Sequence, residues 1–385
     1  MPATPTRHDP PAVSVIVPAR NEEASLKNCL DSLVAQANVA FEIIVINDHS
    51  TDRTHEIASS FSDKRVRVIE AGALPSGWTG KNNAVTAGAK VAHGAWLLFT
   101  DADTVHLPGS LARSIEEATR QHAALLSYSP QQVVKSVWEK AVMPVIFAEL
   151  AASFRPAQVS DPNSPAAAAN GQYLLITREA YDAVGGHAAI AAKLLEDVAL
   201  ARAVKKSGRK IYFRFGGDAV RTRMYRTFAQ LREGWTKNLV LLFPSPTRLA
   251  TLRALEFILI VSSFATAITT ARHGHFQPAV AAGMLGAILY AMFLTRIRRA
   301  DFSWGAALLA LFGLPLFSYL LVRSKLSHKH GNVWWKGRRY PTGPAVTDPG
   351  VTDPAVAGVT ITGIANPAKP DSTMQEQHGL SHAQS

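Results

Sequence analysis

Short apolar runs alternate with segments of helical periodicity over the first half of the chain. Four runs have the apolar, β-branched composition of buried strands. Between them, apolar residues recur at helical spacing in residues 23–36, 52–61 and 81–92. This alternation predicts an α/β domain with a mainly parallel sheet that helices cover on both faces. The four predicted strands are Val13–Val17, Glu42–Ile46, Val66–Ile69 and Trp96–Phe99.

The pattern changes after Arg214 to three long apolar runs, with one acid, Glu256, at an edge. Each run is near the lower length limit for crossing a bilayer, roughly 17 to 25 residues. Basic residues at their ends favour a membrane over the core of a soluble domain. We therefore expect two or three membrane-embedded helices within residues 255–322. The runs are Leu255–Ala271, Ala279–Thr295 and Gly305–Val322.

The two ends of the chain differ from these regions. Residues 1–12 have no apolar core, so we expect a disordered N-terminus that is neither a signal peptide nor an anchor. Residues 323–340 form a basic juxtamembrane segment. Residues 341–385 are rich in Pro, Gly, Ala and Thr, which predicts a disordered tail.

The net charge of +11 is concentrated beside the apolar runs. Nine Lys or Arg residues and one acid lie between Arg296 and Arg339. This placement favours lipid headgroups as the partner and argues against nucleic acid. A single cysteine, Cys29, cannot form an internal disulfide, which fits a reducing compartment.

Ligands of open α/β sheets bind beyond the carboxyl ends of the strands. The first of these turns has no glycine, which excludes a dinucleotide fingerprint. Pro75 and Asn82 occupy positions where a phosphate-binding P-loop around Lys81 would need Gly and Ser or Thr. The four strand-end segments are Pro18–Glu22, Asn47–Asp52, Glu70–Ala84 and Thr100–Asp103.

Asp101 and Asp103 follow the fourth predicted strand and are two residues apart. Two carboxylates held this close repel one another unless a cation neutralises them. A divalent metal that also binds a substrate diphosphate would do so and would stabilise a departing phosphate. The alternative is a polar turn in which Asp101 caps a helix that begins at Pro108.

Three motifs taken together indicate a family. "VSVIVPARNEEASLKNCLDSL", "EIIVINDHSTDRT" and "WLLFTDAD", in this order and spacing, resemble a family 2 inverting glycosyltransferase with the GT-A fold. The resemblance extends over roughly residues 13–238 and implies a hexosyltransferase-type enzyme with a GT-A catalytic domain over residues 13–245. It implies a nucleotide-diphosphate sugar donor bound where the strands end.

The resemblance also assigns donor-side roles to individual residues. Asp48 and Asp52 would lie near the base and ribose, although Asn47 stands where many members carry an acid. Asp101 and Asp103 would hold Mg²⁺ or Mn²⁺, and Asp101 would also contact the donor. The residues expected to line the nucleotide pocket are Pro18, Arg20, Asn21 and Glu22.

The stretch "SGWTGKNNA" resembles the G-W-x-G-K segment of lipid-directed members associated with hopanoid and carotenoid biosynthesis. Its glycines permit close backbone approach, Lys81 offers a cation for phosphate, and Trp78 offers a flat apolar face. Taken alone, the segment is better explained as an ordinary surface loop with a solvated lysine. Within the family pattern it indicates a membrane lipid as acceptor.

Transfer with inversion needs a base near the acceptor hydroxyl. Glu196 and Asp197 open a helical segment, where acids are also stabilised by the helix dipole alone. The resemblance matches this pair to the family's catalytic motif, so Asp197 is the expected base and Glu196 its support. Residues expected to line the acceptor site are Asn170, Gly171 and Gln172.

One motif is imperfect. Many membrane members carry the motif Q-x-x-R-W. In "QLREGW", Arg232 comes one position too early after Gln230, and two residues separate it from Trp235. We keep Arg232 and Trp235 as substrate-binding candidates. The altered motif argues against a processive polysaccharide synthase.

The membrane topology contains a conflict. If the catalytic domain is cytosolic, two crossings place the basic segment "RIRRADF" back in the cytosol, as the positive-inside rule prefers. A third crossing would export the basic residues 323–340, which the same rule opposes. One resolution is that residues 305–322, interrupted by "GLP", re-enter and return. "WWKGRRY", which resembles a C-terminal feature of related lipid glycosyltransferases, could then meet the active site. Residues 135–154 would lie in the headgroup layer or pack inside the domain.

The function predicted from the sequence is a multi-pass inner-membrane glycosyltransferase with a cytoplasmic catalytic domain. It would transfer one sugar to a hopanoid, carotenoid or similar isoprenoid lipid. Polyprenyl phosphate is an alternative acceptor. An alternative of another class is a catalytically silent membrane scaffold.

Overall fold

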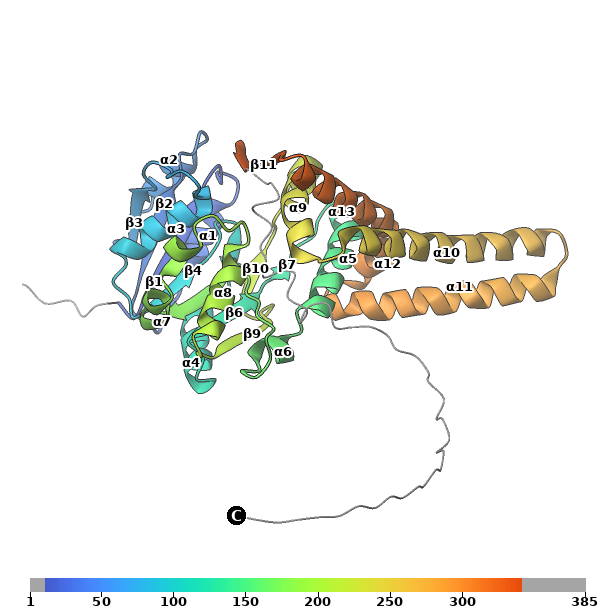
Figure 1. Cartoon of the computed structure of the whole chain (residues 1–385), viewed down its shortest axis with the longest axis horizontal. Helices are drawn as coiled ribbons and strands as arrows, with labels where there is room; N and C mark the ends of the chain where they lie inside the picture. Colours follow the sequence, from blue (N-terminus) through green and yellow to red (C-terminus); the bar gives the residue numbers. More distant parts are fainter. Residues whose placement is uncertain (1–10, 341–385) are drawn as a thin grey trace, which may run out of the picture.

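A seven-stranded mixed sheet lies at the centre of residues 11–340, the part of the chain that the computed structural model describes (Figure 1). The strand order is β3-β2-β1-β4-β8-β6-β9. β8 runs antiparallel to both of its neighbours, and all other paired strands of this sheet are parallel. The strands are β1 Val13–Ala19, β2 Phe41–Asn47, β3 Val66–Glu70, β4 Trp96–Phe99, β6 Leu125–Ser129, β8 Leu174–Thr177 and β9 Ile211–Phe215.

Helices cover both faces of this sheet because its strands are apolar on both sides. Val13, Val15 and Val17 of β1 pack on one face, and Ile16 packs on the other, as the alternation of side chains along a strand requires. The first face carries α1 Leu26–Val34, α2 Thr54–Ser59 and α4 Ser110–Arg120. The second carries α3 Gly80–Val91, α7 Arg178–Ala183 and α8 Glu196–Lys206.

The predicted α/β sheet, covered on both faces, is confirmed. All four predicted strands are present, each with the same core residues. β8 was not predicted, and it makes the sheet mixed because the chain reaches it only after a helical excursion beyond the sheet. The N-terminal and C-terminal predictions fall largely outside the described residues, since residues 1–10 and 341–385 are not described.

A small second sheet borders the ends of the central strands. Its order is β5-β10-β7. The helix expected to begin at Pro108 begins instead at Ser110, with Gly109 as its N-cap at φ 70°. The prediction that Asp101 could cap this helix is therefore wrong. The remaining elements here are β5 Thr104–His106, β7 Gln131–Gln132, β10 Val220–Thr222, α6 Pro156–Ser160 and the 3-10 helix η1 Gly186–Ile190.

A separate helical cluster joins the region of the central sheet to the apolar helices. Val142 and Ile146 of α5 are fully buried in it, so residues 135–154 pack inside the protein, one of the two predicted alternatives. Gly313 allows α13 to approach closely, because an added Cβ would lie 2.0 Å from the Ala141 carbonyl oxygen. The helices of this cluster are α5 Val137–Ser153, α9 Phe228–Leu242, α10 Pro246–Arg272, α11 Phe276–Ile297, α12 Trp304–Leu309 and α13 Gly313–Lys329, with 3-10 turns η2 Arg298–Ala300 and η3 Ala310–Phe312.

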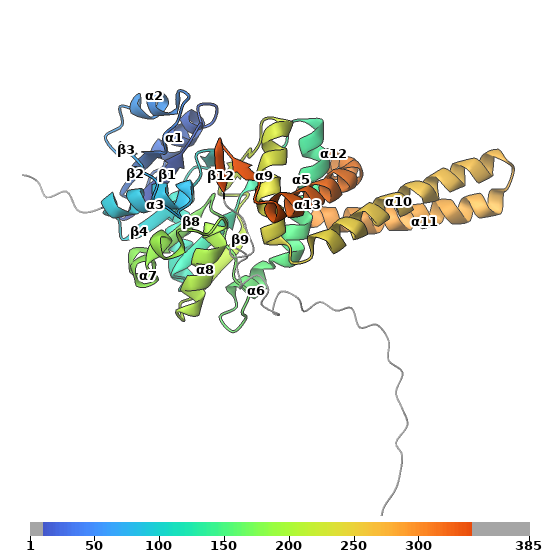
Figure 2. The ribbon, with the colours of Figure 1, turned by 45° about the horizontal axis from the view of Figure 1, so that its top comes forward.

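Three helical segments are long and apolar enough to cross a membrane. α10 and α11 lie side by side and project away from the sheet (Figures 1 and 2). The most apolar windows of Pro246–Arg272 and Phe276–Ala300 are 11% and 17% buried, whereas that of Trp304–Lys329 is 44% buried. The third segment is thus partly enclosed, since α13 contacts α5, α9 and α10.

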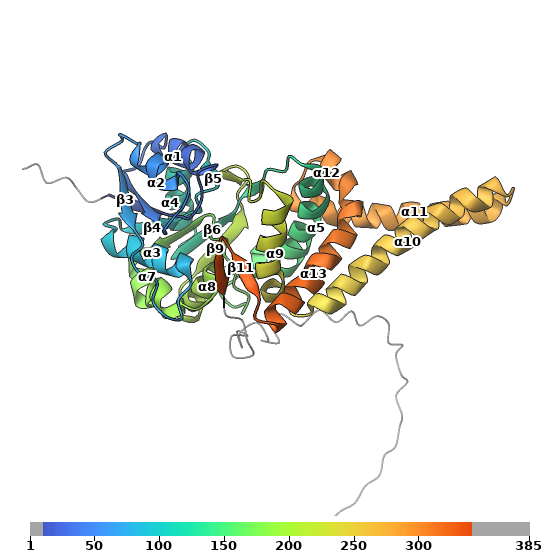
Figure 3. The same cartoon turned by 90° about the horizontal axis from the view of Figure 1, so that it is seen from above.

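The basic segment that follows α13 turns back toward the sheet. Strands β11 Val333–Trp335 and β12 Arg338–Tyr340 form a hairpin beside α9 (Figure 3). Its turn consists of Lys336 and Gly337, at φ 47° and 74°, the left-handed conformations of a two-residue hairpin loop. The chain that follows the third apolar segment therefore returns to the region of the central sheet.

Four charged residues connect α5 to the long apolar helices. The Glu149 carboxylate lies 2.8 Å from Arg253 Nε and 3.7 Å from Arg296 Nε. Glu256 lies 2.9 Å from Arg253 and 2.8 Å from Arg296. Two acids thus neutralise two arginines at the base of α10 and α11, where uncompensated charge would be costly.

We predict that Glu149→Gln lowers the free energy of unfolding by about 2 kcal/mol, because it leaves two partly buried arginines sharing one acid. Thermal unfolding in detergent measures this loss. The control is Asp31→Asn, because Asp31 and Lys27 form an exposed pair that contributes under about 0.5 kcal/mol. Equal effects of the two substitutions would contradict the prediction.

Candidate active site

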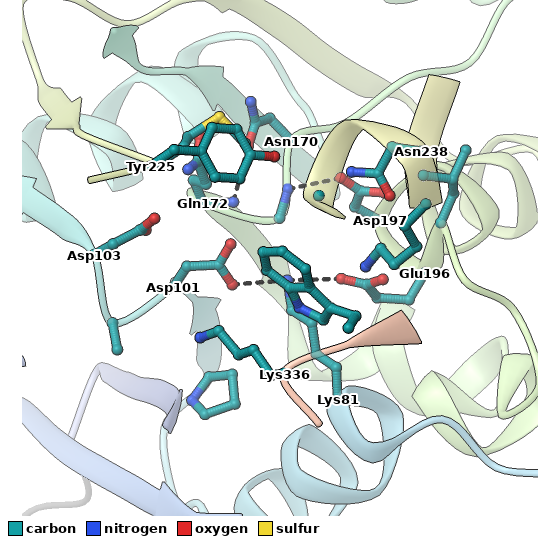
Figure 4. Close-up of a pocket in the computed structure, with 18 of the residues that line it drawn as sticks. Lys81, Asp101, Asp103, Asn170, Gln172, Glu196, Asp197, Tyr225, Asn238 and Lys336 are labelled. Carbon is teal, nitrogen blue, oxygen red and sulfur yellow. Dashed lines mark hydrogen bonds and ion pairs between the residues drawn. The ribbon is translucent and has the colours of Figure 1, made fainter. Parts of the chain in front are cut away.

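A cavity of about 610 Å³ opens where the central strands end. Residues from the ends of β1, β2 and β4, the loop before β8 and the start of α8 line it, together with α5, α9 and the C-terminal hairpin. The close-up in Figure 4 shows side chains from these separate elements converging on one space. The predicted site residues that line this cavity are Pro18, Arg20, Asn21, Glu22, Asp48, Lys81, Asp101, Asp103, Asn170, Gly171, Gln172, Glu196, Asp197 and Trp235.

Lys81 connects the two acidic motifs. Its Nζ atom lies 2.7 Å from Asp101 Oδ1 and 2.7 Å from Glu196 Oε1 (Figure 4). Burial lowers the pKa of Lys81, but the two carboxylates outweigh this effect and raise the pKa well above its ordinary value. A permanently charged ammonium therefore joins the end of β4 to the start of α8.

Asp103 is a half-buried acid with one buried oxygen that has no partner in the described part of the chain. Its Oδ1 atom has no hydrogen-bond donor among the described residues. Burial, followed by repulsion from Glu22 and Asp101, raises its pKa to about 7. Such a carboxylate is suited to a cation that the protein itself does not supply.

The acids around Asp103 fit a divalent metal that is completed by substrate. Within residues 11–340, no group of three or more His, Cys, Asp or Glu side chains is arranged as a metal site. Mg²⁺ is commonly held by one or two carboxylates together with substrate phosphates and water. Two aspartates and a diphosphate would therefore suffice.

Asp197 is held at the first turn of α8 by backbone amides. Gly171 N donates to its Oδ2 at 2.9 Å, and Val198 N donates to its Oδ1 at 2.8 Å. Burial and the adjacent Glu196 carboxylate raise the pKa of Asp197 to about 6. Burial also favours a higher pKa for Glu196, but the Lys81 ammonium outweighs it and lowers the pKa. Glu196 is thus the charged partner of Lys81, and Asp197 is the more basic carboxylate of the pair.

The strand ends on the donor side are connected to the C-terminal hairpin. Arg338 binds both carboxylate oxygens of Asp48, with Nη2 2.9 Å from Oδ1. Lys336 forms an ion pair with Glu22 and donates to the Arg20 carbonyl oxygen at 3.0 Å. These two basic residues were not named singly among the predicted site residues, but both lie in "WWKGRRY", the segment that was expected to be able to meet the active site.

The glycine at the start of α3 has a role that the sequence did not indicate. A Cβ on Gly80 would lie 1.8 Å from Arg338 Nη1 and 2.9 Å from Asp48 Oδ2. The close approach expected at "GWTGK" is therefore made by a guanidinium group of the chain itself. Lys81, in the same segment, binds two carboxylates.

Three predicted site residues lie outside the cavity lining. Asp52 accepts hydrogen bonds from the backbone amides of Thr54 and Glu23, at 3.0 and 3.1 Å. Trp78 is half-buried in the loop before α3, and Arg232 is exposed on α9. The structure does not bring these three side chains to the acids, so their predicted substrate contacts gain no support from it.

The cavity has further polar lining residues that the sequence reasoning missed. Tyr225, Lys237 and Asn238 line it together with Lys336 and Arg338. Lys237 and Asn238 lie on α9 within two and three residues of Trp235. The helical register of the "QLREGW" segment was the one available signal for them.

A family model supports the same region independently. Residues 14–185 match the model described as glycosyl transferase family 2. Residues 14–185 are a family 2 glycosyltransferase domain, and the chain is a glycosyltransferase. Its mixed sheet, with strand-end acids facing one cavity, is the GT-A arrangement implied by the sequence resemblance.

The glycosyltransferase is also similar to curated proteins over most of its length. It is 27% identical over 338 residues to the 4,4'-diaponeurosporenoate glycosyltransferase of Staphylococcus aureus strain USA300, covering 86% of this chain and 88% of that protein. The protein of the same name from strain MRSA252 is 27% identical over 336 residues, with the same coverage. Both similarities extend beyond the family domain into the apolar helices.

Solved structures resemble this fold at lower sequence identity. A mannosyltransferase from Pyrobaculum calidifontis, in complex with GDP-Man and Mn²⁺, is 17% identical with a TM-score of 0.48, covering 85% of this chain and 88% of that one. Residues 1–349 of S. aureus TarS, in complex with UDP-GlcNAc, are 15% identical with a TM-score of 0.42, covering 80% of this chain and 90% of that one.

The contact between Gly171 and the charged bridge gives a test of the site. A Cβ on Gly171 would lie 3.0 Å from Lys81 Nζ and 3.3 Å from Glu196 Oε1. We predict that Gly171→Ala displaces the ammonium and lowers the rate of sugar transfer by about 10-fold, because small displacements of catalytic groups are costly. The thermal midpoint should change little, since the tip of a lysine side chain can move. Gly217→Ala is the matched control, because its Cβ would meet no atom closer than 3.5 Å; equal activity of both variants would contradict the prediction.

Proposed function

We propose that this enzyme is a membrane-bound inverting glycosyltransferase that transfers a single sugar from a nucleotide-diphosphate sugar to a hopanoid, carotenoid or similar isoprenoid lipid. The observation that carries the proposal is the cavity itself. It combines strand-end acids with an apolar wall from α5, a helix that packs against the apolar C-terminal helices. Similarity to a diaponeurosporenoate glycosyltransferase supports a lipid acceptor.

The donor would lie between the ends of β1, β2 and β4. Pro18, Arg20 and Asn21 would line the nucleotide pocket, with the Asp48–Arg338 pair at its side. Asp52, Trp78 and Arg232, which do not line the cavity, are left out of this donor site. Lys336 and Lys81 supply positive charge at the phosphate end.

Asp103, with help from Asp101, would hold Mg²⁺ or Mn²⁺ at the donor diphosphate. When bound, the metal would neutralise charge on the departing diphosphate. Asp103 contributes a buried carboxylate oxygen that no described protein group binds. Lys81 keeps Asp101 in place by binding its other side.

Asp197 would remove the proton of the acceptor. Its two oxygens receive backbone hydrogen bonds that fix the carboxylate, and its raised pKa makes it a stronger base than an ordinary aspartate. Asn170, Gly171 and Gln172 would line the acceptor side. Glu196 supports the site by binding Lys81.

The enzyme would be a multi-pass protein of the inner membrane with a cytoplasmic catalytic domain. α10 and α11 would cross and return, placing the loop between them outside. α12 and α13 would stay at the cytoplasmic face, because α13 leads directly to a hairpin that contacts the donor side. This arrangement keeps the basic residues 323–340 inside and resolves the conflict with the positive-inside rule.

Two alternatives remain distinct from this proposal. Polyprenyl phosphate would already carry an anionic nucleophile and would demand less of a base. A catalytically silent scaffold would keep the fold without transfer, but the acids of both motifs are present and share one cavity.

The proposal predicts that membranes containing the enzyme label an endogenous lipid when incubated with one member of a panel of radiolabelled sugar nucleotides. Labelling should require divalent metal and fall at least about 100-fold in Asp103→Ala, because a metal ligand at the leaving group is lost. Asp31→Ala, on an exposed helical face, should label as wild type does. Absence of labelling with every donor, or full labelling by Asp103→Ala, would refute the enzymatic proposal.

A second prediction concerns pH. Because burial and Glu196 raise the pKa of Asp197 to about 6, its basic form is lost as the pH falls below that value. Transfer rates should therefore drop about 10-fold per pH unit below pH 6, and Asp197→Asn should lower the rate by about 100-fold or more. Initial rates between pH 5 and 8 at saturating donor test this. An Asp197→Asn enzyme with normal activity would favour polyprenyl phosphate instead.

A further inference from the structure

The outer surface of the segment from α12 to α13 is hydrophobic and is left uncovered by the described part of the chain. Six large side chains along it are between 41% and 64% exposed. At the helical advance of about 100° per residue they fall within roughly 80° of the helix circumference, so they form one stripe. This exposed stripe consists of Trp304, Leu308, Phe312, Tyr319, Val322 and Leu326.

The opposite face of the same segment is packed inside the protein. Leu314, Phe317 and Leu321 are fully buried there. The buried hydroxyl of Ser324 donates to the Thr236 carbonyl oxygen of α9 at 2.7 Å. Because α9 lines the catalytic cavity, the exposed stripe lies on the outer side of a helix that is bonded to the wall of the active site.

Both ends of this segment lie beside the same end of the α10–α11 pair. At its start, Arg298 Cζ, just past α11, lies 4.5 Å from the centroid of the Trp304 ring. Near its end, Lys325 Nζ donates to the hydroxyl of Thr247, in the first turn of α10, at 2.7 Å. Figure 3 shows α13 running across the base of the pair, where α10 begins and α11 ends. A segment held in this way does not cross the membrane that α10 and α11 would span.

The neighbours of α13 also belong outside the hydrocarbon of a bilayer. α13 packs along α9. On α9, Arg232 is exposed, and Glu233 accepts a hydrogen bond from Lys336 N at 2.9 Å. Charged side chains are costly at the centre of a bilayer. The exposed stripe is therefore level with the membrane boundary, where its outer side can enter the acyl chains while α9 stays on the aqueous side.

Exposed cations flank the stripe over its last two turns. Arg323, Lys325 and Lys329 are exposed on α13, next to Val322 and Leu326. No carboxylate of residues 11–340 forms an ion pair with any of the three. An apolar helix face bordered by Lys and Arg is complementary to a bilayer surface with anionic headgroups.

We propose that the segment Trp304–Lys329 is a binding surface for anionic phospholipids and lies in the plane of the cytoplasmic leaflet. The stripe enters the leaflet by about 5–10 Å, the depth of an interfacial helix. The three flanking cations bind lipid phosphates. This inference rests on the proposed function, in which α10 and α11 cross the membrane, and it names the partner of a further surface. Through Ser324 and Thr236 the surface holds α9, and with it the cavity, against the bilayer.

Membrane depth along the segment gives the first test. Cys29 is the only cysteine of the chain and is fully buried, so an introduced exposed cysteine can be spin-labelled selectively. The full-length enzyme is placed in vesicles of phosphatidylcholine and phosphatidylglycerol, and depth is measured from spin relaxation by oxygen and by a water-soluble nickel chelate. The substitutions, all at exposed positions, are Leu308→Cys, Phe312→Cys, Tyr319→Cys and Leu326→Cys.

We expect the four labels at similar shallow depths, within about 10 Å of the headgroups. Leu285→Cys, exposed on α11, is the deep reference, and Lys90→Cys on α3 is the aqueous reference. Labels at positions 312 and 319 as deep as the α11 reference would indicate a crossing or re-entrant segment and would overturn the inference. Four aqueous labels would overturn it too and would leave the stripe to a protein partner. An aqueous label at position 285 would instead refute the membrane placement in the proposed function.

The choice of headgroup gives the second test. Spin-labelled phosphatidylglycerol should associate with the wild-type enzyme at least about threefold better than spin-labelled phosphatidylcholine, because one cation at an anionic surface is worth about fivefold at its own site. The preference should fall by at least about half when the three cations of α13 are replaced together. The variant combines Arg323→Gln, Lys325→Gln and Lys329→Gln.

The matched control removes the same charge from exposed positions around the central sheet and should keep the wild-type preference. It combines Lys64→Gln, Lys90→Gln and Lys206→Gln. Equal association of both lipids with the wild-type enzyme would overturn the role of the cations. An α13 variant that keeps the full preference, or a control variant that loses as much of it, would overturn that role as well.

Discussion

The site depends on the compensation of negative charge in a cavity that is partly removed from water. Glu22, Asp48, Asp101, Asp103, Glu196 and Asp197 all line it. Carboxylates this close would repel one another and take up protons without nearby cations. Lys81 neutralises the centre, and Lys336 and Arg338 neutralise the donor side. Burial and neighbouring carboxylates raise the pKa of Asp103 and that of Asp197, and these are the acids that the proposed chemistry uses.

The same cations connect parts of the fold that are distant in sequence. Lys81 joins α3 to the end of β4 and the start of α8, so the metal motif and the base motif share one rigid support. Arg338 and Lys336 bring the end of the described chain onto the first two strands. In sequence, the apolar helices therefore lie between the central sheet and the C-terminal hairpin, and both of these line the same cavity.

α5 couples the catalytic region to the apolar helices. One side of it packs against α12 and α13, and the other contributes Phe147 and Leu150 to the cavity. Its two acids have specific partners: Glu139 binds Arg223, and Glu149 binds Arg253. An apolar helix with neutralised acids can support a lipid passage without itself crossing the bilayer.

Local patterns in the sequence were sufficient for the strands, for most of the helices on the sheet and for the acids at the strand ends. β-branched runs such as Val13–Val17 and the turn residues after them are properties of short segments, and the rule that ligands bind at strand ends converts them into a site. β8 was missed because its direction depends on where the preceding excursion returns to the sheet. Trp78 and Arg232 fit the motifs by position, but helix and loop geometry directs them away from the cavity.

The sequence by itself therefore determined the α/β class, the family and the acidic residues of the site, because each is encoded within a few consecutive residues. Only the tertiary structure decided which cations neutralise those acids. Arg338 meets Asp48 across 290 positions, and Lys237 faces the cavity because of the rotational position of α9. The energy of such contacts depends on distances and burial that arise only when the chain has folded, so no local pattern records them.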